Sequence, residues 1–220
     1  MVTRPYHSCK YSLDEKFFDK WSGAMAYVLG FWFADGYMRH EKSYRIVFIS
    51  NDRNILRQIR RVLGASHPIT DRKTDRSLVL SVFSKRLYQR LAILGGLRRK
   101  SRTVRFPRIP DKYLKDFIRG YFDGDGSVFF VNYISTKNGK PRRELRSNFT
   151  SGSKLFLDGL MDALNQRLGL APKKLGSYNL GRSLKLGYGT HDTKKLLKFI
   201  YSPDFSIGLR RKASFVRFCR

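Results

Sequence analysis

The chain contains an internal duplication, and this duplication restricts the fold more than any other feature of the sequence. Residues 96–106 and 208–218 both begin with Gly-Leu-Arg-Arg-Lys and end with Val-Arg-Phe, and only the three positions between differ. Residues 29–36 are similar to residues 119–126, and both segments end with Asp-Gly. Three weaker echoes follow in the same order: 48–50 with 149–151, 63–64 with 168–169, and 77–80 with 183–186. Echoes in register predict two copies of one unit, related by a pseudo-twofold axis.

Hydrophobic periodicity predicts the order helix, two strands, helix, two strands, helix for each unit. Ser22 and Ser84 are expected to cap the first and last helices of the first unit, and Gly36 to stop the first. The elements expected there are helices over 22–35, 55–63 and 85–94, and strands over 37–41, 43–50 and 77–83. The second unit should have a helix opening at or near Asp116, a hairpin over 128–150, a helix over 154–168, a strand over 183–188 and a helix over 191–201.

The fold class that follows is α+β, with two pseudo-twofold-related αββαββα repeats. We expect an N-terminal repeat over 1–107, which includes an arm over 1–21, and a C-terminal repeat over 108–220. Residues 102–111 should link the repeats, because Pro107 and Pro110 disfavour helix and central strand.

The charge of the chain indicates its partner. Lys and Arg number 45 against 17 Asp and Glu, which gives a net charge of +28, while 41% hydrophobic residues exclude a disordered basic tail. A net positive charge of this size creates an electrostatic field that favours nucleic acid as the binding partner. An acidic membrane would favour a basic amphipathic helix, but the basic residues are spread along the chain, and the best apolar run, 24–34, has about half the length of a bilayer span. Cys9 and Cys219 are too few for a disulfide framework. We expect a soluble, intracellular protein.

Small residues recur at every fourth position in both copies of the first helix. Ala26, Gly30 and Ala34 form one such ridge, and Gly120 and Gly124 form the other. Helices with these ridges can pack backbone to backbone. We therefore expect Ala26, Gly30 and Gly120 at the interface between the repeats, with the C-terminal ends of both helices side by side.

Each of these helix ends carries an aspartate, Asp35 or Asp125. Main-chain carbonyls at a helix C-terminus, the negative end of its dipole and a carboxylate together form an all-oxygen site that suits Mg²⁺. Two such ions can activate a water and stabilise the leaving oxygen in phosphodiester hydrolysis. An ordinary Asp-Gly turn is the alternative for one copy taken singly. Its presence at matching positions of both repeats favours a metal site.

Residues 27–36 and 117–126 resemble the two signature helices of a single-chain LAGLIDADG homing endonuclease. The resemblance covers most of the chain, because that family is built from the same unit. It implies that Asp35 and Asp125, with the carbonyls of Ala34 and Gly124, bind two or three divalent ions. Mg²⁺ would be the working ion and Ca²⁺ a non-catalytic substitute. It also implies a saddle-shaped antiparallel sheet on double-stranded DNA, and cuts across the minor groove that leave 3′ overhangs.

One position departs from that family's pattern. Phe33 stands where the family often has an acid, whereas Asp123 fits at the matching position of the second repeat. We expect the loss of a cap or a packing contact on one side, with the chemistry intact.

The resemblance further implies a lysine near each metal site and a polar residue that positions water. Lys100 and Lys212 of the duplicated string match the lysines, and Ser50 and Ser151 at the ends of the central strands match the polar residue. A cation there can polarise the water or screen phosphate charge. The alternative for the lysines is a basic cluster that only anchors phosphates. For the serines it is a strand terminator or helix cap.

Alternation along the strands predicts which side chains face DNA. The expected contact residues are Tyr37, Arg39, Arg45, Arg76, Lys137, Lys140, Arg142, Arg143, Arg146, Asn148 and Lys185. Four of these, Lys137, Lys140, Arg142 and Arg143, are expected in a hairpin loop that contacts phosphates and not bases. A merely solvated charge is the alternative for any single arginine.

These features predict a monomeric, Mg²⁺-dependent, site-specific DNA endonuclease. Its target should be long and asymmetric, because the two halves differ in nearly every expected contact residue. Two alternatives share the fold: an RNA maturase that assists intron splicing, whose partner would be intron RNA, and a non-catalytic DNA-binding regulator. Both aspartates and both lysines are present, which favours the enzyme over the regulator.

Overall fold

The computed structural model describes residues 10–41, 43–72, 75, 77–97, 102–178 and 180–219. The first repeat consists of α1 (Gly23–Asp35), β1 (Gly36–His40), β2 (Tyr44–Ser50), α2 (Arg53–Val62), β3 (Ile69–Asp71), β4 (Leu78–Phe83) and α3 (Lys85–Ile93). The second consists of α4 (Asp111–Asp125), β5 (Gly126–Ile134), β6 (Pro141–Ser151), α5 (Lys154–Leu168), β7 (Gly176–Tyr178), β8 (Ser183–Tyr188) and α6 (Thr190–Ile200). A short α7 (Arg210–Ala213) and a 3-10 helix, η1 (Ser214–Phe218), follow. The expected αββαββα order therefore occurs twice.

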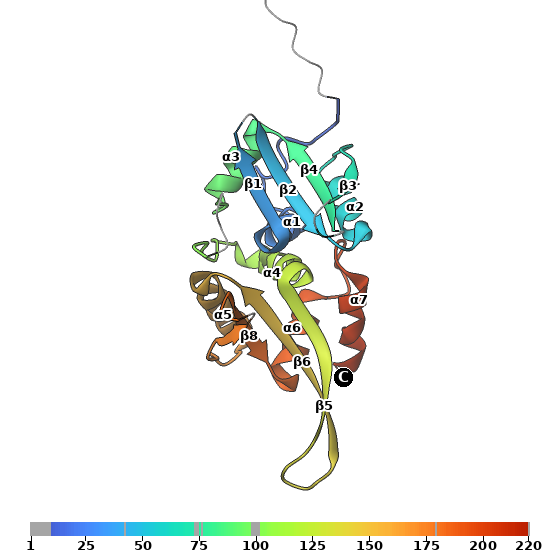
Figure 1. Ribbon diagram of the computed structural model, residues 1–220, viewed down its shortest axis with the longest axis vertical. Helices are drawn as coiled ribbons and strands as arrows, with labels where there is room; N and C mark the ends of the chain where they lie inside the picture. Colours follow the sequence, from blue (N-terminus) through green and yellow to red (C-terminus); the bar gives the residue numbers. More distant parts are fainter. Residues whose placement is uncertain are drawn as a thin grey trace, which may run out of the picture.

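Each repeat forms its own four-stranded antiparallel sheet. The strand orders are β1-β2-β4-β3 and β5-β6-β8-β7, so the two sheets have the same topology. The register also matches, because Gly36 pairs with Phe48 in one sheet and Gly126 pairs with Phe149 in the other. Figure 1 shows the N-terminal half above the C-terminal half, with α1 and α4 meeting between them. The α+β fold class and the pseudo-twofold relation are confirmed.

The helices α1 and α4 form the centre of the core. Every residue of α1 from Met25 to Phe33 is buried, which explains its lack of a polar face. A Cβ added to Gly30 would lie 2.0 Å from the carbonyl oxygen of Phe117, and one added to Gly120 would lie 2.1 Å from that of Tyr27. Backbone therefore meets backbone at both glycines. Ala26 on the same ridge is fully buried.

The helix ends follow the sequence with two exceptions. Ser22 and Ser84 cap α1 and α3 as expected, accepting hydrogen bonds from the backbone N–H groups of Met25 and Leu87. Gly36 does end α1, but its φ of −118° is extended and not left-handed. Glycine is required there by close approach, because a Cβ would lie 2.3 Å from the ring of Trp32.

The second exception is the start of α4. This helix begins at Asp111, directly after Pro110, and not at or near Asp116 as expected. Asp116 lies one turn inside the helix and is only 8% exposed. Its carboxylate accepts a hydrogen bond from Arg119 at 2.6 Å, so it serves as a buried ion-pair partner and not as a cap.

The two repeats differ most at the hairpin β5–β6. Its strands have 9 and 11 residues, against 5 and 7 in the hairpin β1–β2. The longer hairpin projects below the body of the molecule (Figure 1). The boundary expected between residues 107 and 108 falls in the stretch between α3 and α4, and that division stays a prediction. Among the described residues, none of the helices combines the length and the apolar character that crossing a membrane requires.

Candidate active site

The C-terminal ends of α1 and α4 meet at the centre of the molecule, and each ends on an aspartate. A Cβ added to Gly124 would lie 2.4 Å from the Cβ of Ala34 and 3.1 Å from Oδ2 of Asp35. The Asp35 carboxylate therefore lies against the last turn of the opposite helix. Both Asp35 and Asp125 are half-buried, which leaves each side chain with access to solvent.

A pocket opens on each side of this contact. The Asp35 pocket, of about 490 Å³, is lined by Asp35, Ser50, Asn51, Asp52, Arg53, Asn54, Asp123, Gly124 and Arg211. The Asp125 pocket, of about 180 Å³, is lined by Phe33, Ala34, Val104, Tyr121, Asp125, Ser151 and Gly152. Each pocket thus combines the aspartate of one helix with the small residue in the last turn of the other. It also contains the serine that ends the central strand of the aspartate's own repeat.

The donor atoms at these pockets suit a hard divalent cation. Each pocket offers a carboxylate and a residue whose carbonyl lies at a helix C-terminus, and Mg²⁺ and Ca²⁺ prefer such oxygens. Among the described residues, no cluster of three or more His, Cys, Asp or Glu side chains could form a protein-only metal cage. A bound ion would therefore keep waters or take phosphate oxygens, as Mg²⁺ commonly does. The residues present fit such an ion.

Lys212 caps the end of α4 from the C-terminal segment. Its ammonium donates to the carbonyl oxygens of Phe122 at 2.6 Å, Asp123 at 2.9 Å and Gly126 at 2.6 Å. The hydroxyl of Thr150 donates to the carbonyl oxygen of Asp125 at 3.0 Å. Neither side chain uses the carbonyl of Gly124, which is the one that the resemblance assigns to a metal.

Lys212 is buried against the end of α4. The side chain is 5% exposed, and this burial lowers the pKa of its ammonium to about 8. Lys212 positions the last turn of α4, and both expected roles, a direct effect on water and the anchoring of phosphates, stay predictions. Lys100 of the first repeat lies outside the described residues.

Ser50 and Ser151 occupy matching places. The hydroxyl of Ser50 accepts a hydrogen bond from the backbone N–H of Asp52, and that of Ser151 accepts one from Ser153, each at 3.1 Å. These bonds shape the turn between strand and helix in both repeats. Because the serines also line the two pockets, a role in positioning water stays a prediction beside this turn-forming role.

Two buried sets of hydrogen bonds near the site escaped the sequence analysis, although Asp123 itself was named there. Tyr121 donates to the carbonyl oxygen of Thr150 at 2.7 Å, and burial, followed by the charges of Asp125 and Asp35, raises the pKa of its hydroxyl well above the ordinary value. The hydroxyl therefore stays protonated beside the two carboxylates. The only sequence signal was a tyrosine where the first repeat has Phe31.

The second set is centred on Asp123, which is 3% exposed. Its carboxylate accepts from the hydroxyls of Tyr27 at 2.7 Å and Tyr201 at 2.5 Å, and from the backbone N–H of Leu209 at 2.8 Å. Burial raises the pKa of Asp123, and these three donors oppose that effect. The network fixes the C-terminal segment that carries Lys212.

The open face of the first sheet carries the expected contact residues. Tyr37 and Arg39 alternate with the buried Met38, and the guanidinium of Arg39 lies 5.3 Å from the ring centre of Tyr37. Arg45 pairs with Arg39 across the strands, and its Nη2 donates to the hydroxyl of Ser81 at 2.7 Å. Arg45 is therefore held across the sheet and is not a freely solvated charge. Arg76 lies outside the described residues.

The open face of the second sheet has a different polar network. Arg146 donates to Glu144 at 2.8 Å, and the hydroxyl of Tyr133 donates to the same carboxylate at 2.5 Å. Lys185 lies opposite Thr150, so it shares this face. Asn148 was expected to project from it, but it is only 9% exposed. Asn148 has the expected strand parity, and its contact with DNA stays a prediction.

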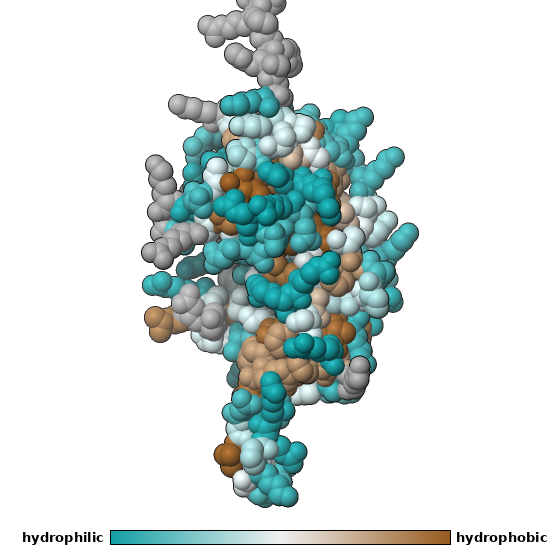
Figure 2. All heavy atoms as spheres, turned by 90° about the vertical axis from the view of Figure 1, so that its right-hand side faces the viewer, coloured by the Kyte–Doolittle hydropathy of each residue, from teal (hydrophilic) through white to brown (hydrophobic). Residues whose placement is uncertain are grey.

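The hairpin residues correct one expectation. Arg142 and Arg143 belong to the strand β6 and not to the loop, which leaves Lys137 and Lys140 as its exposed basic residues. Successive strand residues point to opposite faces. Arg142 thus shares the open face with Tyr133, whereas the guanidinium of Arg143 lies 3.8 Å from the ring centre of Phe130 on the other face. The surface of the hairpin is mostly hydrophilic (Figure 2).

Comparison with known proteins agrees with this architecture. Residues 22–96 and 112–183 each match the LAGLIDADG-like domain, which together is more than half of the chain. The chain therefore belongs to the LAGLIDADG family. It carries two repeats in one polypeptide, with the fold of the single-chain homing endonucleases.

Solved structures share this fold over most of their length. I-SmaMI bound to an uncleaved DNA target in the presence of calcium ions superimposes with a TM-score of 0.63 at 14% identity, over 91% of this chain and 90% of that chain. I-DmoI in complex with DNA and Mn gives a TM-score of 0.56 at 22% identity, over 82% and 97% of the two chains. Likeness at these identities is evidence for the fold alone.

One curated relative matches by sequence. A probable translation initiation factor IF-2 of Thermococcus kodakarensis is 29% identical over 163 residues, which cover 70% of this chain. The same match covers only 12% of that relative's length.

Proposed function

We propose that this protein is a site-specific DNA endonuclease that uses divalent metal ions to cut both strands of a long asymmetric target and leaves 3′ overhangs. The observation that carries the proposal is the pairing of the two pockets, in which Asp35 lies with Gly124 and Asp125 lies with Ala34. Two equivalent sites in one polypeptide suit two scissile phosphates. Structures of I-DmoI, which has this fold, in complex with DNA and Ca or with DNA and Mn support the metal requirement.

Four residues would hold the ions in this proposal. Asp35 and Asp125 would contribute carboxylates, and Gly124 and Ala34 would contribute carbonyls, for two or three ions in total, with Mg²⁺ in the cell. A divalent ion bound there would supply an activated water and charge stabilisation for phosphodiester hydrolysis. Lys212 positions the last turn of α4 through its three carbonyl contacts. Ser50 and Ser151, at the pocket walls, are the candidates for orienting water.

The two sheets would contact different half-sites of the DNA target. The first face holds Arg45 on Ser81, and the second holds Arg146 and Tyr133 on Glu144. Donors and acceptors fixed in different patterns select different base edges. A monomer of this kind would read an asymmetric sequence, with phosphate contacts fixing its register on the duplex.

A cleavage selection tests the proposal. A supercoiled plasmid library with random inserts would be incubated with the protein and Mg²⁺, and the ends of linearised molecules would be sequenced. We expect one long consensus with staggered 3′ ends. Ca²⁺ should support binding without cutting. If no library member is linearised while the protein still selects DNA by binding, the non-catalytic regulator is the correct alternative.

Substitution of the aspartates tests the metal assignment. Asp35→Asn and Asp125→Asn should each abolish double-strand cleavage and leave DNA binding intact, because each removes a metal ligand and no expected DNA contact. Asp162→Asn is the matched control, since it makes the same change at an exposed position of α5. Double-strand cutting at the wild-type rate by both active-site variants would overturn the assignment.

A further inference from the structure

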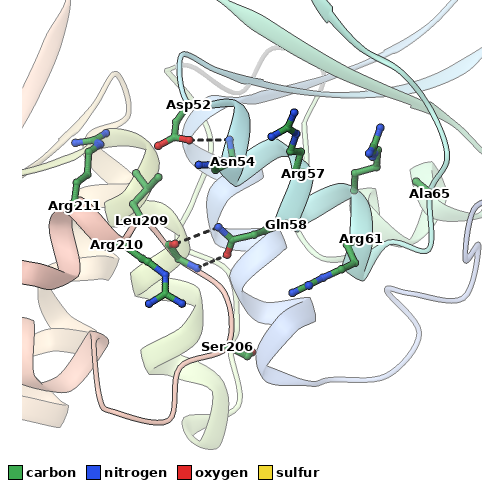
Figure 3. A pocket seen from close by; sticks show the side chains of 12 residues that line it. Asp52, Asn54, Arg57, Gln58, Arg61, Ala65, Ser206, Leu209, Arg210 and Arg211 are labelled. Carbon is green, nitrogen blue, oxygen red and sulfur yellow. Dashed lines mark hydrogen bonds between the residues drawn. The ribbon is translucent and has the colours of Figure 1, made fainter.

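A basic cleft opens on one flank of the molecule, away from the centre of the two sheets. Its volume is about 870 Å³, and its walls are α2 of the first repeat and the segment that leads into α7 of the second. Arg57, Arg60 and Arg61 line one wall, and Arg210 and Arg211 line the other. Figure 3 shows arginine side chains on both walls, with Arg61 pointing toward the opposite wall, and Figure 2 faces the same flank.

The two walls are tied together by a side-chain bridge. The amide of Gln58 donates to the carbonyl oxygen of Gly208 at 3.4 Å and accepts from its backbone N–H at 3.1 Å. The next residue, Leu209, donates to the buried Asp123. The bridge crosses the middle of the cleft in Figure 3. The arginines of the two walls are therefore held at a fixed separation before any ligand arrives.

Within the described ranges of the chain, the four exposed arginines of the cleft form no ion pair. Arg57, Arg61, Arg210 and Arg211 are exposed, and none of them forms an ion pair with another described residue. The one carboxylate in the walls, Asp52, accepts hydrogen bonds from the first backbone N–H groups of α2. Guanidinium groups gathered in this way repel one another unless a polyanion binds.

The pseudo-twofold relation shows that the charge of the α2 wall is not a consequence of the fold. Ser50 matches Ser151, so Arg57 matches Asp158 and Arg61 matches Asp162 on the other flank. The pocket there, of about 370 Å³ beside α5, is lined by two acidic residues and one basic residue, Asp111, Asp162 and Arg167. The α2 wall is therefore basic where the matching positions of α5 are acidic, while Arg210 and Arg211 match Arg98 and Arg99, which lie outside the described residues.

The basic cleft is continuous with the Asp35 pocket. Asp52, Asn54 and Arg211 line both. A nucleic-acid strand whose phosphate lies at Asp35 would have its neighbouring phosphates within reach of the cleft. Arginine suits them, because its planar fork can donate two hydrogen bonds to one phosphate.

We propose that this cleft binds backbone phosphates of the DNA strand that passes the Asp35 pocket, so that the α2 flank anchors the target beside the proposed cleavage site. The inference rests on the proposed function. Phosphate contacts there contribute affinity that does not depend on the DNA sequence.

Salt dependence of binding tests this inference. The cleft variant Arg57→Gln/Arg61→Gln/Arg210→Gln would be compared with Arg167→Gln/Lys195→Gln/Lys198→Gln, which removes the same charge from exposed positions of α5 and α6. Affinity for a fluorescent random-sequence duplex would be measured by anisotropy across a KCl series. Each lost phosphate contact lowers the slope of log K against log salt by about 0.9. We expect a decrease of about 2 to 3 in the cleft variant and a wild-type slope in the control.

The outcomes separate the inference from the proposed function. If the wild-type protein binds the duplex and both variants keep its slope, the cleft does not contact DNA and the inference is wrong. If the cleft variant loses slope only on an RNA hairpin, the cleft is an RNA surface and the DNA inference is also wrong. If the wild-type protein fails to bind duplex DNA at all, the proposed function fails first. Single substitutions, each expected to lower the slope by about 0.9, replace the triple variant if it does not fold.

Discussion

The helices α1 and α4 share their terminal aspartate and the glycine at which they meet, but they differ at two buried positions near that end. Both end on an aspartate followed by glycine, and both meet through a glycine. Before that end, α1 has Leu29 and Phe33 where α4 has Arg119 and Asp123. The same fold position is therefore filled by apolar groups in one repeat and by charged groups in the other, and both pairs are buried.

The charged pair of α4 organises the C-terminal segment. Arg119, 1% exposed, donates to the carbonyl oxygens of Ile200 and Ile207 at 3.0 Å each, and to Asp116. Asp123 receives three further donors, one of them the backbone N–H of Leu209. Irregular backbone in a protein interior needs hydrogen-bond partners. Side chains of α4 supply these partners to the segment that leads to Lys212.

The apolar pair of α1 packs against hydrophobic residues. Phe33 packs edge-on against Phe117 at 5.6 Å and stacks on Phe156 of α5 at 5.9 Å between ring centres. The acid that the family often has at this position is thus replaced by packing, and the contact is not simply lost as the sequence suggested. A buried ion pair is seldom more stable than apolar residues of similar volume. The buried charges of α4 therefore fix one conformation of the C-terminal segment.

Replacing a charged residue of α4 with the residue at the matching position of α1 should have the largest effect on stability. Arg119→Leu installs the residue of the first repeat, but it leaves the Asp116 carboxylate and two carbonyls buried without their donor. Breaking a buried pair from one side costs about 3–5 kcal/mol. Urea unfolding followed by circular dichroism would measure the loss. A cost below about 1 kcal/mol, the range of an exposed pair, would contradict the network.

The copied pair provides a sharper version of the same test. Asp116 matches Ala26, so Arg119→Leu/Asp116→Ala reproduces the apolar arrangement of α1 at both positions. Removing both charges should recover part of the stability that the single substitution loses. The carbonyls of Ile200 and Ile207 stay unpaired, so the recovery should be incomplete. A double variant that is less stable than Arg119→Leu would mean that Asp116 has another buried donor.

Adding a side chain at the glycine contact should destabilise the protein equally from either helix. Gly30→Ala and Gly120→Ala each place a Cβ about 2 Å from a backbone oxygen of the opposite helix, so the helices must separate. Overpacking of this kind costs about 1–3 kcal/mol. Cleavage should fall more than stability does, because a misplacement of about 1 Å can cost on the order of a hundredfold in rate. Either variant with wild-type melting and cutting would contradict the shared site.

The symmetry of the fold could be predicted because the duplication places the same sequence pattern in both halves of the chain. Matching echoes defined the repeat, and alternation defined β4 and β8 almost to the residue. The short strands β3 and β7 were not located, because three residues give no periodicity. The start of α4 was placed too late, at or near Asp116, because the sequence does not show that this aspartate is buried inside the helix and paired with Arg119.

The site could be predicted only where it repeats. Asp35, Asp125, Gly30 and Gly120 stand out because each has a twin. Tyr121, Arg119 and the Gln58 bridge have none, and each depends on long-range contacts that a linear pattern does not contain. Asn148 was expected to project from its strand, but alternation gives the face of a residue and not what neighbouring side chains cover.

The smallest expected effect concerns one hydroxyl. Tyr27 of α1 and Phe117 of α4 occupy matching positions, and each contacts the position where the helices differ: Tyr27 donates to Asp123, and Phe117 packs on Phe33. Tyr27→Phe removes one donor from a carboxylate that keeps two others. Burial raises the pKa of Tyr27 well above its ordinary value, so the group lost is a neutral donor at every pH at which the protein would be studied. A hydrogen bond to a charged group contributes about 1.5–3 kcal/mol, and the two remaining donors place the expected loss at about the lower end of that range.

The mirror substitution, Phe117→Tyr, adds a hydroxyl among the rings of Phe33 and Phe106, where a buried donor without a partner costs about 1–3 kcal/mol. Both variants should therefore unfold at lower urea than the wild type, although one removes a hydroxyl and the other adds one. If Phe117→Tyr were neutral while Tyr27→Phe destabilised the protein, the apolar side of the interface would tolerate polar groups. The contrast between the two repeats would then reflect their histories and not their packing.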